Sequence, residues 1–119
     1  MEKRELGKSG LHVKPIAFGG NVFGWTIDEK ESFNLLDAFV DAGFDFIDTA
    51  DTYSWWVEGN VGGESETIIG KWLADRKNRD KIILSTKVGS QTKEHPKDIS
   101  KNFILKSVNE SLRRLKTDY

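Results

Sequence analysis

Three short apolar runs alternate with three longer segments of helical periodicity, and this alternation restricts the fold more than any other feature of the chain. The apolar runs cover residues 16–18, 44–48 and 81–86. Each is followed by a segment whose apolar residues recur at helical spacing. Strands that alternate with amphipathic helices predict an α/β fold in which helices pack on a parallel sheet. The third run is apolar enough to predict a strand covered on both faces.

The predicted helices carry start and stop signals. Asp28 precedes the first helix, Glu31 follows three residues later in a capping-box pattern, and Gly43 ends the helix. The second helix is predicted to begin near Glu64 and the third near Ser100. The side chains expected on the buried faces are Phe33, Leu35, Leu36, Phe39 and Val40 in the first helix, Ile68, Ile69, Trp72 and Leu73 in the second, and Ile104, Val108, Leu112 and Leu115 in the third.

Residues 3–15 predict a β-hairpin ahead of the first parallel strand, because two short strand segments flank the turn-forming run Gly7–Gly10. The chain has no internal repeat, low-complexity tract or linker, so residues 1–119 are predicted to belong to one domain. A hairpin and three βα units can begin either an open doubly wound sheet or a (βα)8 barrel. In both architectures ligands bind at the carboxyl ends of the strands.

The glycines of the chain argue against the doubly wound sheet. Gly19–Gly24 lacks the G-x-G-x-x-G spacing of a dinucleotide-binding turn, and the next helix begins several residues later. A second glycine-rich segment, Gly59–Gly63, precedes Glu64 and Glu66, whose carboxylates in the first helical turn would repel a phosphate. The barrel is therefore the favoured architecture.

Composition excludes several classes of function. Lys and Arg total 18 against 19 Asp and Glu, so no basic field is available for nucleic acid or an anionic membrane. No apolar run approaches the ~20 residues that span a bilayer, and the N-terminus does not resemble a signal peptide. The chain has no cysteine, and its two histidines, His12 and His95, have no neighbouring ligands at metal spacing. We expect a soluble cytoplasmic protein without a metal site.

Asp48, Tyr53 and Lys87 follow two neighbouring predicted strands and point to a specific chemistry. A tyrosine hydroxyl, with an ordinary pKa near ~10, is too weak an acid to act unaided at neutral pH. A nearby lysine ammonium favours the phenolate form, and an aspartate beside the lysine keeps the ammonium charged and in place. Each residue alone has an ordinary structural explanation, as a turn residue, a loop aromatic or a solvated cation. Together on one rim they indicate a proton donor for carbonyl reduction.

The sequence resembles the aldo/keto reductase family, in particular the bacterial branch related to the β-subunits of potassium channels. The similarity extends over the whole chain in family order and spacing. The segments that carry it are Arg4–Leu11, Ile16–Gly20, Phe46–Tyr53, Gly63–Gly70, Leu84–Gly89 and Ser111–Tyr119. The resemblance implies a (βα)8 barrel closed at the bottom by the N-terminal hairpin, with residues 1–119 as the N-terminal portion of that one domain.

The resemblance also implies the activity: reduction of aldehydes or ketones to alcohols by hydride transfer from NADP(H). In this family Tyr53 would be the general acid, Lys87 would favour its phenolate, and Asp48 would orient Lys87. Gly20 and Asn21, with Asp48, match positions near the nicotinamide-ribose end of the cofactor. A set of loop tryptophans, which could equally be loop packing, is expected to line an apolar pocket for the carbonyl substrate: Trp25, Trp55 and Trp56.

The chain departs from the family in extent. A family barrel needs about 250 residues, and the strand whose end carries the family's catalytic histidine has no counterpart here. We therefore expect a truncated portion that is inactive alone, binds NADPH weakly, and is marginally stable or self-associates through unpaired strand edges. The alternative function is a non-enzymatic one, as a cofactor-sensing or partner-binding subunit like the channel β-subunits or as an inert truncated product.

Overall fold

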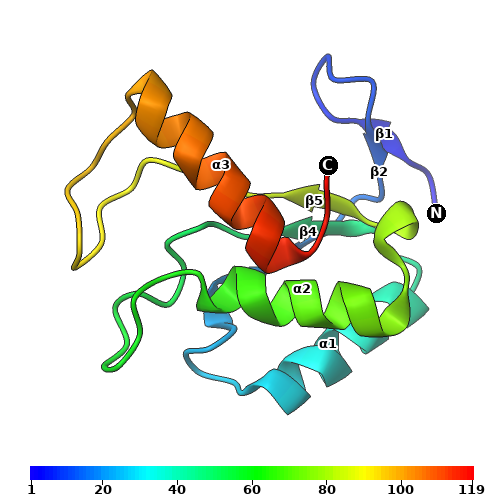
Figure 1. The fold of residues 1–119 in the computed structure, drawn as a ribbon. Coiled ribbons are helices and arrows are strands. Elements are labelled where there is room, and N and C mark those ends of the chain that lie inside the picture. The colour runs from blue at the N-terminus through cyan, green and yellow to red at the C-terminus, as the bar shows by residue number, and fades with distance from the viewer.

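The computed structural model describes residues 1–119 and contains a small hairpin, a parallel sheet and three helices (Figure 1). In chain order the elements are β1 (Arg4–Glu5), β2 (His12–Val13), β3 (Ala17–Gly19), the 3-10 turn η1 (Gly20–Val22), α1 (Glu29–Asp41), β4 (Phe46–Asp48), α2 (Glu64–Arg76), the 3-10 turn η2 (Arg79–Lys81), β5 (Ile83–Ser85) and α3 (Lys101–Leu115). The predicted order of a hairpin and three βα units is confirmed.

The parallel sheet has the order β3-β4-β5, with each strand beside its sequence neighbour. Its register aligns Gly19 with Asp48 and Asp48 with Ser85. The carboxyl ends of all three strands therefore lie at one edge of the sheet. The antiparallel pair β1-β2 is joined to the sheet by Asp45, which accepts from Lys14 N at 2.9 Å and pairs with Lys3 Nζ at 2.8 Å.

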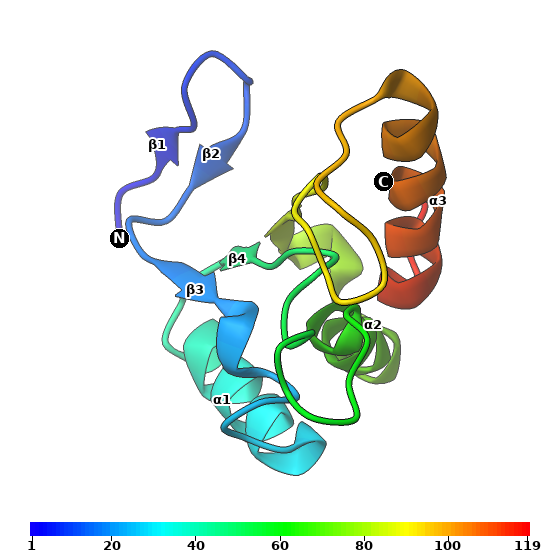
Figure 2. The same cartoon turned by 90° about the vertical axis from the view of Figure 1, so that its left-hand side faces the viewer.

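Both α1 and α2 lie on the same face of the sheet, and α3 packs beside α2 (Figures 1 and 2). The core lies between this face and the helices, where Leu36, Ile47, Ile69 and Trp72 are fully buried. Because side chains alternate across a strand, Asp48 points to the opposite face from Ile47, and no helix covers that face. A sheet with helices on one face is the arrangement of a barrel wall rather than of a doubly wound sheet.

Three predicted burial patterns are wrong, each for a tertiary reason. The strand at 81–86 was expected to be covered on both faces, but β5 is an edge strand with one open face and its residues are only partly buried. In α1, Leu35 faces solvent. In α3, Leu115 is buried as predicted, but Val108 is 44% exposed, and Ser107 and Ser111 complete the buried face.

The small residues of α3 are explained by its close approach to α2. A Cβ built on Gly70 would lie 2.0 Å from the carbonyl oxygen of Arg114, so the two backbones nearly touch. Leu115 joins the core cluster that contains Ile69 and Trp72 of α2, whereas Val108 is left exposed. None of the helices combines the length and the apolar character needed to span a bilayer.

Candidate active site

The structure brings Asp48, Tyr53 and Lys87 together at the carboxyl edge of the sheet. Lys87 Nζ donates to Asp48 Oδ2 at 2.7 Å and to the carbonyl oxygen of Thr49 at 2.6 Å. The same ammonium lies 4.7 Å from the centroid of the Tyr53 ring. Lys87 is thus the centre of the group, with the carboxylate on one side and the phenol ring on the other.

The charge of Lys87 is secured by these neighbours. Partial burial on its own would lower the pKa of Lys87, but the hydrogen bond and charge of Asp48, assisted by Tyr53, outweigh burial and hold that pKa above its usual value. Lys87 is therefore a permanent cation near the Tyr53 ring at any physiological pH.

Tyr53 lies in the loop between β4 and α2, and two polar side chains fix this loop against the loop that follows β3. Ser54, at a left-handed φ of 74°, donates to the carbonyl oxygen of Phe23 at 2.6 Å. Asn60 Nδ2 donates to the carbonyl oxygens of Gly24 and Ser54, both at 3.0 Å. These bonds hold Tyr53 in place although it belongs to no regular element.

Two of the three predicted tryptophans gather beside Tyr53. The rings of Trp25 and Trp56 lie 5.4 Å apart and nearly perpendicular, and the Trp56 ring lies 6.3 Å from that of Tyr53. Trp25 and Trp56 are 49% and 41% exposed, so their faces are available to a ligand. Trp55 is half-buried and takes no part in these ring contacts.

Of the residues predicted to contact the cofactor, Gly20 is buried and Asn21 is exposed. Gly20 is buried in η1, where a Cβ would lie 3.1 Å from Ser65 Oγ and 3.3 Å from the Asp48 carbonyl oxygen. Gly19, which pairs with Asp48, would have no atom within 4 Å of an added Cβ, so the space beside the end of β4 is open.

A set of hydrogen-bonded polar residues next to this site, of which Thr49, Ser65 and Glu66 are buried, was missed from the sequence. It includes Glu66, which was interpreted only as a first-turn acid but is fully buried. The missed residues are Thr49, Ser65, Glu66, Thr86 and Arg114. The threonines and the serine stand at strand ends or at a helix start, where side-chain hydrogen bonds to loops are common, whereas nothing in the sequence marks Arg114 as the partner of Glu66.

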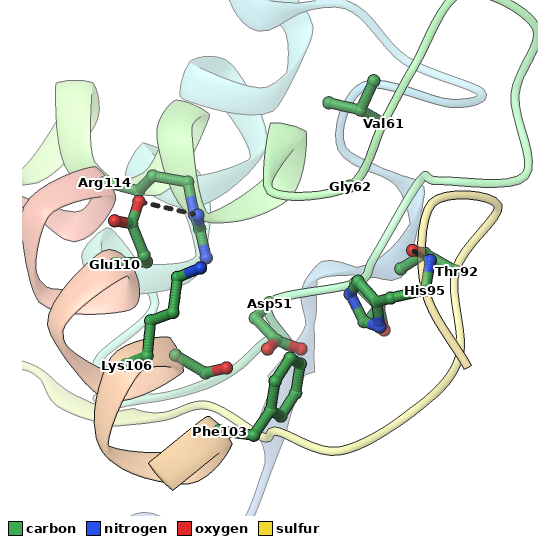
Figure 3. Close-up of a pocket in the computed structure, with 11 residues that line it drawn as sticks. Asp51, Val61, Gly62, Thr92, His95, Phe103, Lys106, Glu110 and Arg114 are labelled. Atoms are coloured by element: carbon green, nitrogen blue, oxygen red, sulfur yellow. Dashed lines mark hydrogen bonds and ion pairs between the residues drawn. The ribbon is translucent and has the colours of Figure 1, made fainter. Parts of the chain in front are cut away.

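A cavity of about 200 Å³ lies between the loops that follow β4 and β5 and the helix α3 (Figure 3). Asp51 and Lys106 are directed toward it, with Arg114 on its helical wall. Burial, reinforced by the charge of Glu66, raises the pKa of Asp51 above its usual range. The cavity is distinct from the Lys87 group, and no cluster of three or more potential metal ligands occurs in the structure.

Comparison with known proteins identifies the family of the chain. A model of the aldo/keto reductase family matches residues 15–119. The chain belongs to the aldo/keto reductase family. It is 39% identical to an oxidoreductase, YrpG, of Bacillus subtilis over all of this chain and 38% of that protein. It is also 61% identical, over 78% of its length, to an 11.2 kDa protein of Pseudescherichia vulneris, of which the match covers 91%.

Solved structures decide between the two architectures. The aldo-keto reductase AKR11C1 of Bacillus halodurans, in its holo form, matches 100% of this chain with a TM-score of 0.83 and 39% identity. A second aldo-keto reductase, from Pseudomonas aeruginosa, matches 98% with a TM-score of 0.81. The matches cover 38% and 43% of those barrel proteins. The chain is the hairpin and three βα units of an aldo/keto reductase barrel, and the doubly wound alternative is wrong.

Proposed function

We propose that residues 1–119 carry the proton-donating part of an NADP(H)-dependent carbonyl reductase. The observation that carries this proposal is the contact of one ammonium, that of Lys87, with both the Asp48 carboxylate and the Tyr53 ring. Such a cation favours a phenol that gives up its proton, and such a carboxylate keeps the cation in place. The membership of the reductase family supports the same reaction.

In the proposed reaction Tyr53 donates its hydroxyl proton to the substrate's carbonyl oxygen as negative charge develops there. Lys87 stabilises the phenolate that remains, and Asp48 holds Lys87 at 2.7 Å so that the ammonium does not turn to solvent. A bound nicotinamide cofactor would supply the hydride to the carbonyl carbon.

The residues at the strand ends fit such a cofactor. Gly19 leaves open space beside Asp48, and Asn21 is exposed on the next turn of the chain, so a flat ring could approach the rim without displacing a side chain. Gly20, Asn21 and Asp48 would hold the nicotinamide-ribose end. One relative, from Phanerodontia chrysosporium, is an aryl-alcohol dehydrogenase [NADP(+)], which supports NADP(H) as the cofactor.

We propose aromatic aldehydes and ketones as the substrate class. Trp25 and Trp56 present a perpendicular pair of rings beside Tyr53, and aromatic substrates pack well against such rings. Trp55 would complete the wall from within the same loop. The relative named aryl-alcohol dehydrogenase [NADP(+)] supports an aromatic substrate.

The chain spans 38% of the Bacillus halodurans reductase, so the reaction is proposed for a complete barrel. The test is a chimera in which residues 1–119 replace the matching part of that reductase. NADPH oxidation with benzaldehydes is followed by absorbance. Tyr53→Phe is expected to lower kcat about 100-fold or more while NADPH binding, followed by fluorescence, is retained.

Tyr119→Phe is the matched control, because the Tyr119 ring lies against Arg79 and Lys87 makes its hydrogen bonds with Asp48 and Thr49 instead, and it is expected to retain full turnover. Equal turnover by the Tyr53 and Tyr119 variants would contradict the role of Tyr53. NADPH binding without any turnover in the chimera would instead favour a cofactor-sensing protein. Residues 1–119 alone are expected to bind NADPH weakly and to show no turnover.

A further inference from the structure

The first turn of α2 contacts the carboxyl ends of β3 and β4 through one serine. Ser65 Oγ donates to the carbonyl oxygen of Gly20 at 2.6 Å and lies 2.8 Å from Thr49 Oγ1. Ser65 and Thr49 are both fully buried. Since Thr49 follows Asp48 directly, this serine fixes the backbone next to the carboxylate that holds Lys87.

The next residue of α2 makes the equivalent contact with β5. Glu66 Oε2 accepts from Thr86 Oγ1 at 2.8 Å, and Glu66 Oε1 accepts from Arg114 Nε at 2.8 Å and pairs with Arg114 Nη2 at 2.7 Å. Glu66 is fully buried, and an unpaired carboxylate there would be strongly destabilising. Arg114 therefore compensates the charge of the buried Glu66 carboxylate and fixes which oxygen faces Thr86.

Arg114 reaches Glu66 because α2 carries glycines where the arginine crosses it. A Cβ on Gly63 would lie 2.7 Å from Arg114 Cδ, and Gly70 lies against the Arg114 backbone. Figure 3 shows the extended Arg114 side chain on the wall of α3. A side chain at Gly63 would displace the Arg114 side chain, and one at Gly70 would clash with the Arg114 backbone, so both glycines permit the crossing that brings Arg114 to Glu66.

These contacts converge on the candidate proton donor. Thr86 directly precedes Lys87, and the Lys87 carbonyl oxygen accepts from Asp51 N at 3.1 Å, so the backbone of Lys87 is restrained on both sides. We propose that Glu66, oriented by Arg114, is a positioning residue that sets Lys87 against Asp48 and Tyr53 through its hydrogen bond with Thr86. As an account of catalysis this rests on the function proposed above, whereas the geometry of Lys87 can be tested without turnover.

A purely structural role is the competing explanation, since Glu66 also joins α3 to α2. Thr86→Val separates the two roles, because it removes the hydroxyl that contacts Glu66 and leaves the Glu66–Arg114 pair intact. Thr67→Val is the matched control. Thr67 is in the same turn of α2, and its Oγ1 donates at 2.8 Å to the carbonyl oxygen of Gly63 and to no strand.

The test is NMR of the 119-residue protein with ¹³C in the lysine ε-methylene groups. The Lys87 ε-methylene lies near the Tyr53 ring, so its chemical shift reports their contact. Thr86→Val is expected to move this signal toward that of exposed lysines and to lower the titration midpoint of Lys87, while Thr86→Ser restores both. Thr67→Val should leave the Lys87 signal unchanged with a comparable loss of thermal stability. An unchanged Lys87 signal in Thr86→Val would overturn the proposal.

The kinetic consequence is measured in the chimera with the Bacillus halodurans reductase. Thr86→Val is expected to lower kcat about tenfold, the order of effect expected for a misplaced catalytic group, with KM for NADPH and aldehyde within about twofold of the unmodified chimera. A shifted Lys87 signal in a chimera that has no turnover at all would uphold the positioning role and reject the proposed reaction. A shifted Lys87 signal in Thr86→Val with unchanged kcat would mean that Glu66 positions Lys87 but that this positioning does not affect catalysis.

Discussion

At the scale of the residue, two carboxylates near Lys87 show how strongly one ion-pair partner determines the environment of a buried acid. Glu66 is fully buried, and Arg114 pairs with its carboxylate at 2.7 Å. Asp51 is half-buried beside it and has no ion pair. Burial and the charge of Glu66 raise the pKa of Asp51, so its ionised form is disfavoured in the folded protein.

Asp51→Asn is therefore expected to stabilise the fold at neutral pH. A carboxyl group whose pKa is higher in the folded than in the unfolded state lowers stability progressively as the pH rises from the unfolded value, 3.8, through the folded one. The gain at pH 7 should be below about 1 kcal/mol, because the group is partly solvated and screened, and it should shrink as the pH approaches 4. Thermal melts at a series of pH values measure it, with the exposed Asp118→Asn as control. A lower melting temperature for Asp51→Asn at pH 7 would contradict the prediction, because it would mean that the Asp51 carboxylate stabilises the folded protein.

At the scale of the element, the sequence predicts features that depend on nearby residues in the chain, such as the ends of a helix. It does not predict which side chains are buried where that depends on packing against another element. The start of α1 was predicted correctly because Asp28 accepts from Glu31 N at 2.8 Å within one turn, and Gly43 follows the helix with a φ of +92°. The buried face of α3 was predicted only in part: Leu115 is buried as expected, but Val108 is exposed, because Gly70, on another helix, draws the two backbones together. The proximity of Asp48 and Lys87 could be predicted because parallel strands end at one edge, whereas the Glu66–Arg114 pair depends on how α3 crosses α2.

Gly70→Ala should disrupt the packing of α3 on α2. A methyl group would lie 2.0 Å from a backbone carbonyl oxygen, which cannot move as a side-chain end can. The overpacking cost of about 3 kcal/mol should exceed the gain of about 1 kcal/mol in helix propensity. Urea unfolding followed by circular dichroism measures the difference in the free energy of unfolding.

Gly19→Ala is the control for stability, because a Cβ there has no atom within 4 Å and φ is −87°. If Gly70→Ala were as stable as the unchanged protein, this result would contradict the close approach of the α2 and α3 backbones at Gly70.

At the scale of the whole molecule, the sheet has two edges without a partner strand, those of β3 and β5. Ile83 N donates to Asp45 O at 2.8 Å and Ser85 O accepts from Thr49 N at 2.9 Å, so the backbone groups of these two residues face β4. By alternation the backbone groups of Leu84 point to the free edge. Beside this edge lies an apolar groove of about 150 Å³, lined chiefly by Leu84, Val88, Val108, Leu112, Leu115 and Tyr119.

We propose that a second copy of the chain covers this groove, and we predict that Val108→Lys weakens the association. Val108 is 44% exposed on the apolar stripe of α3, so a lysine there is tolerated by the single chain but places a charge where the second copy would bind. Sedimentation velocity over a range of protein concentrations measures the association.

Asn109→Lys is the matched control, because it adds the same charge at the neighbouring, exposed position outside the groove. The association should weaken at least tenfold for Val108→Lys and change little for Asn109→Lys. Equal weakening by both variants would mean that net charge alone drives association, and a concentration-independent sedimentation coefficient for the unchanged protein would reject the self-association altogether.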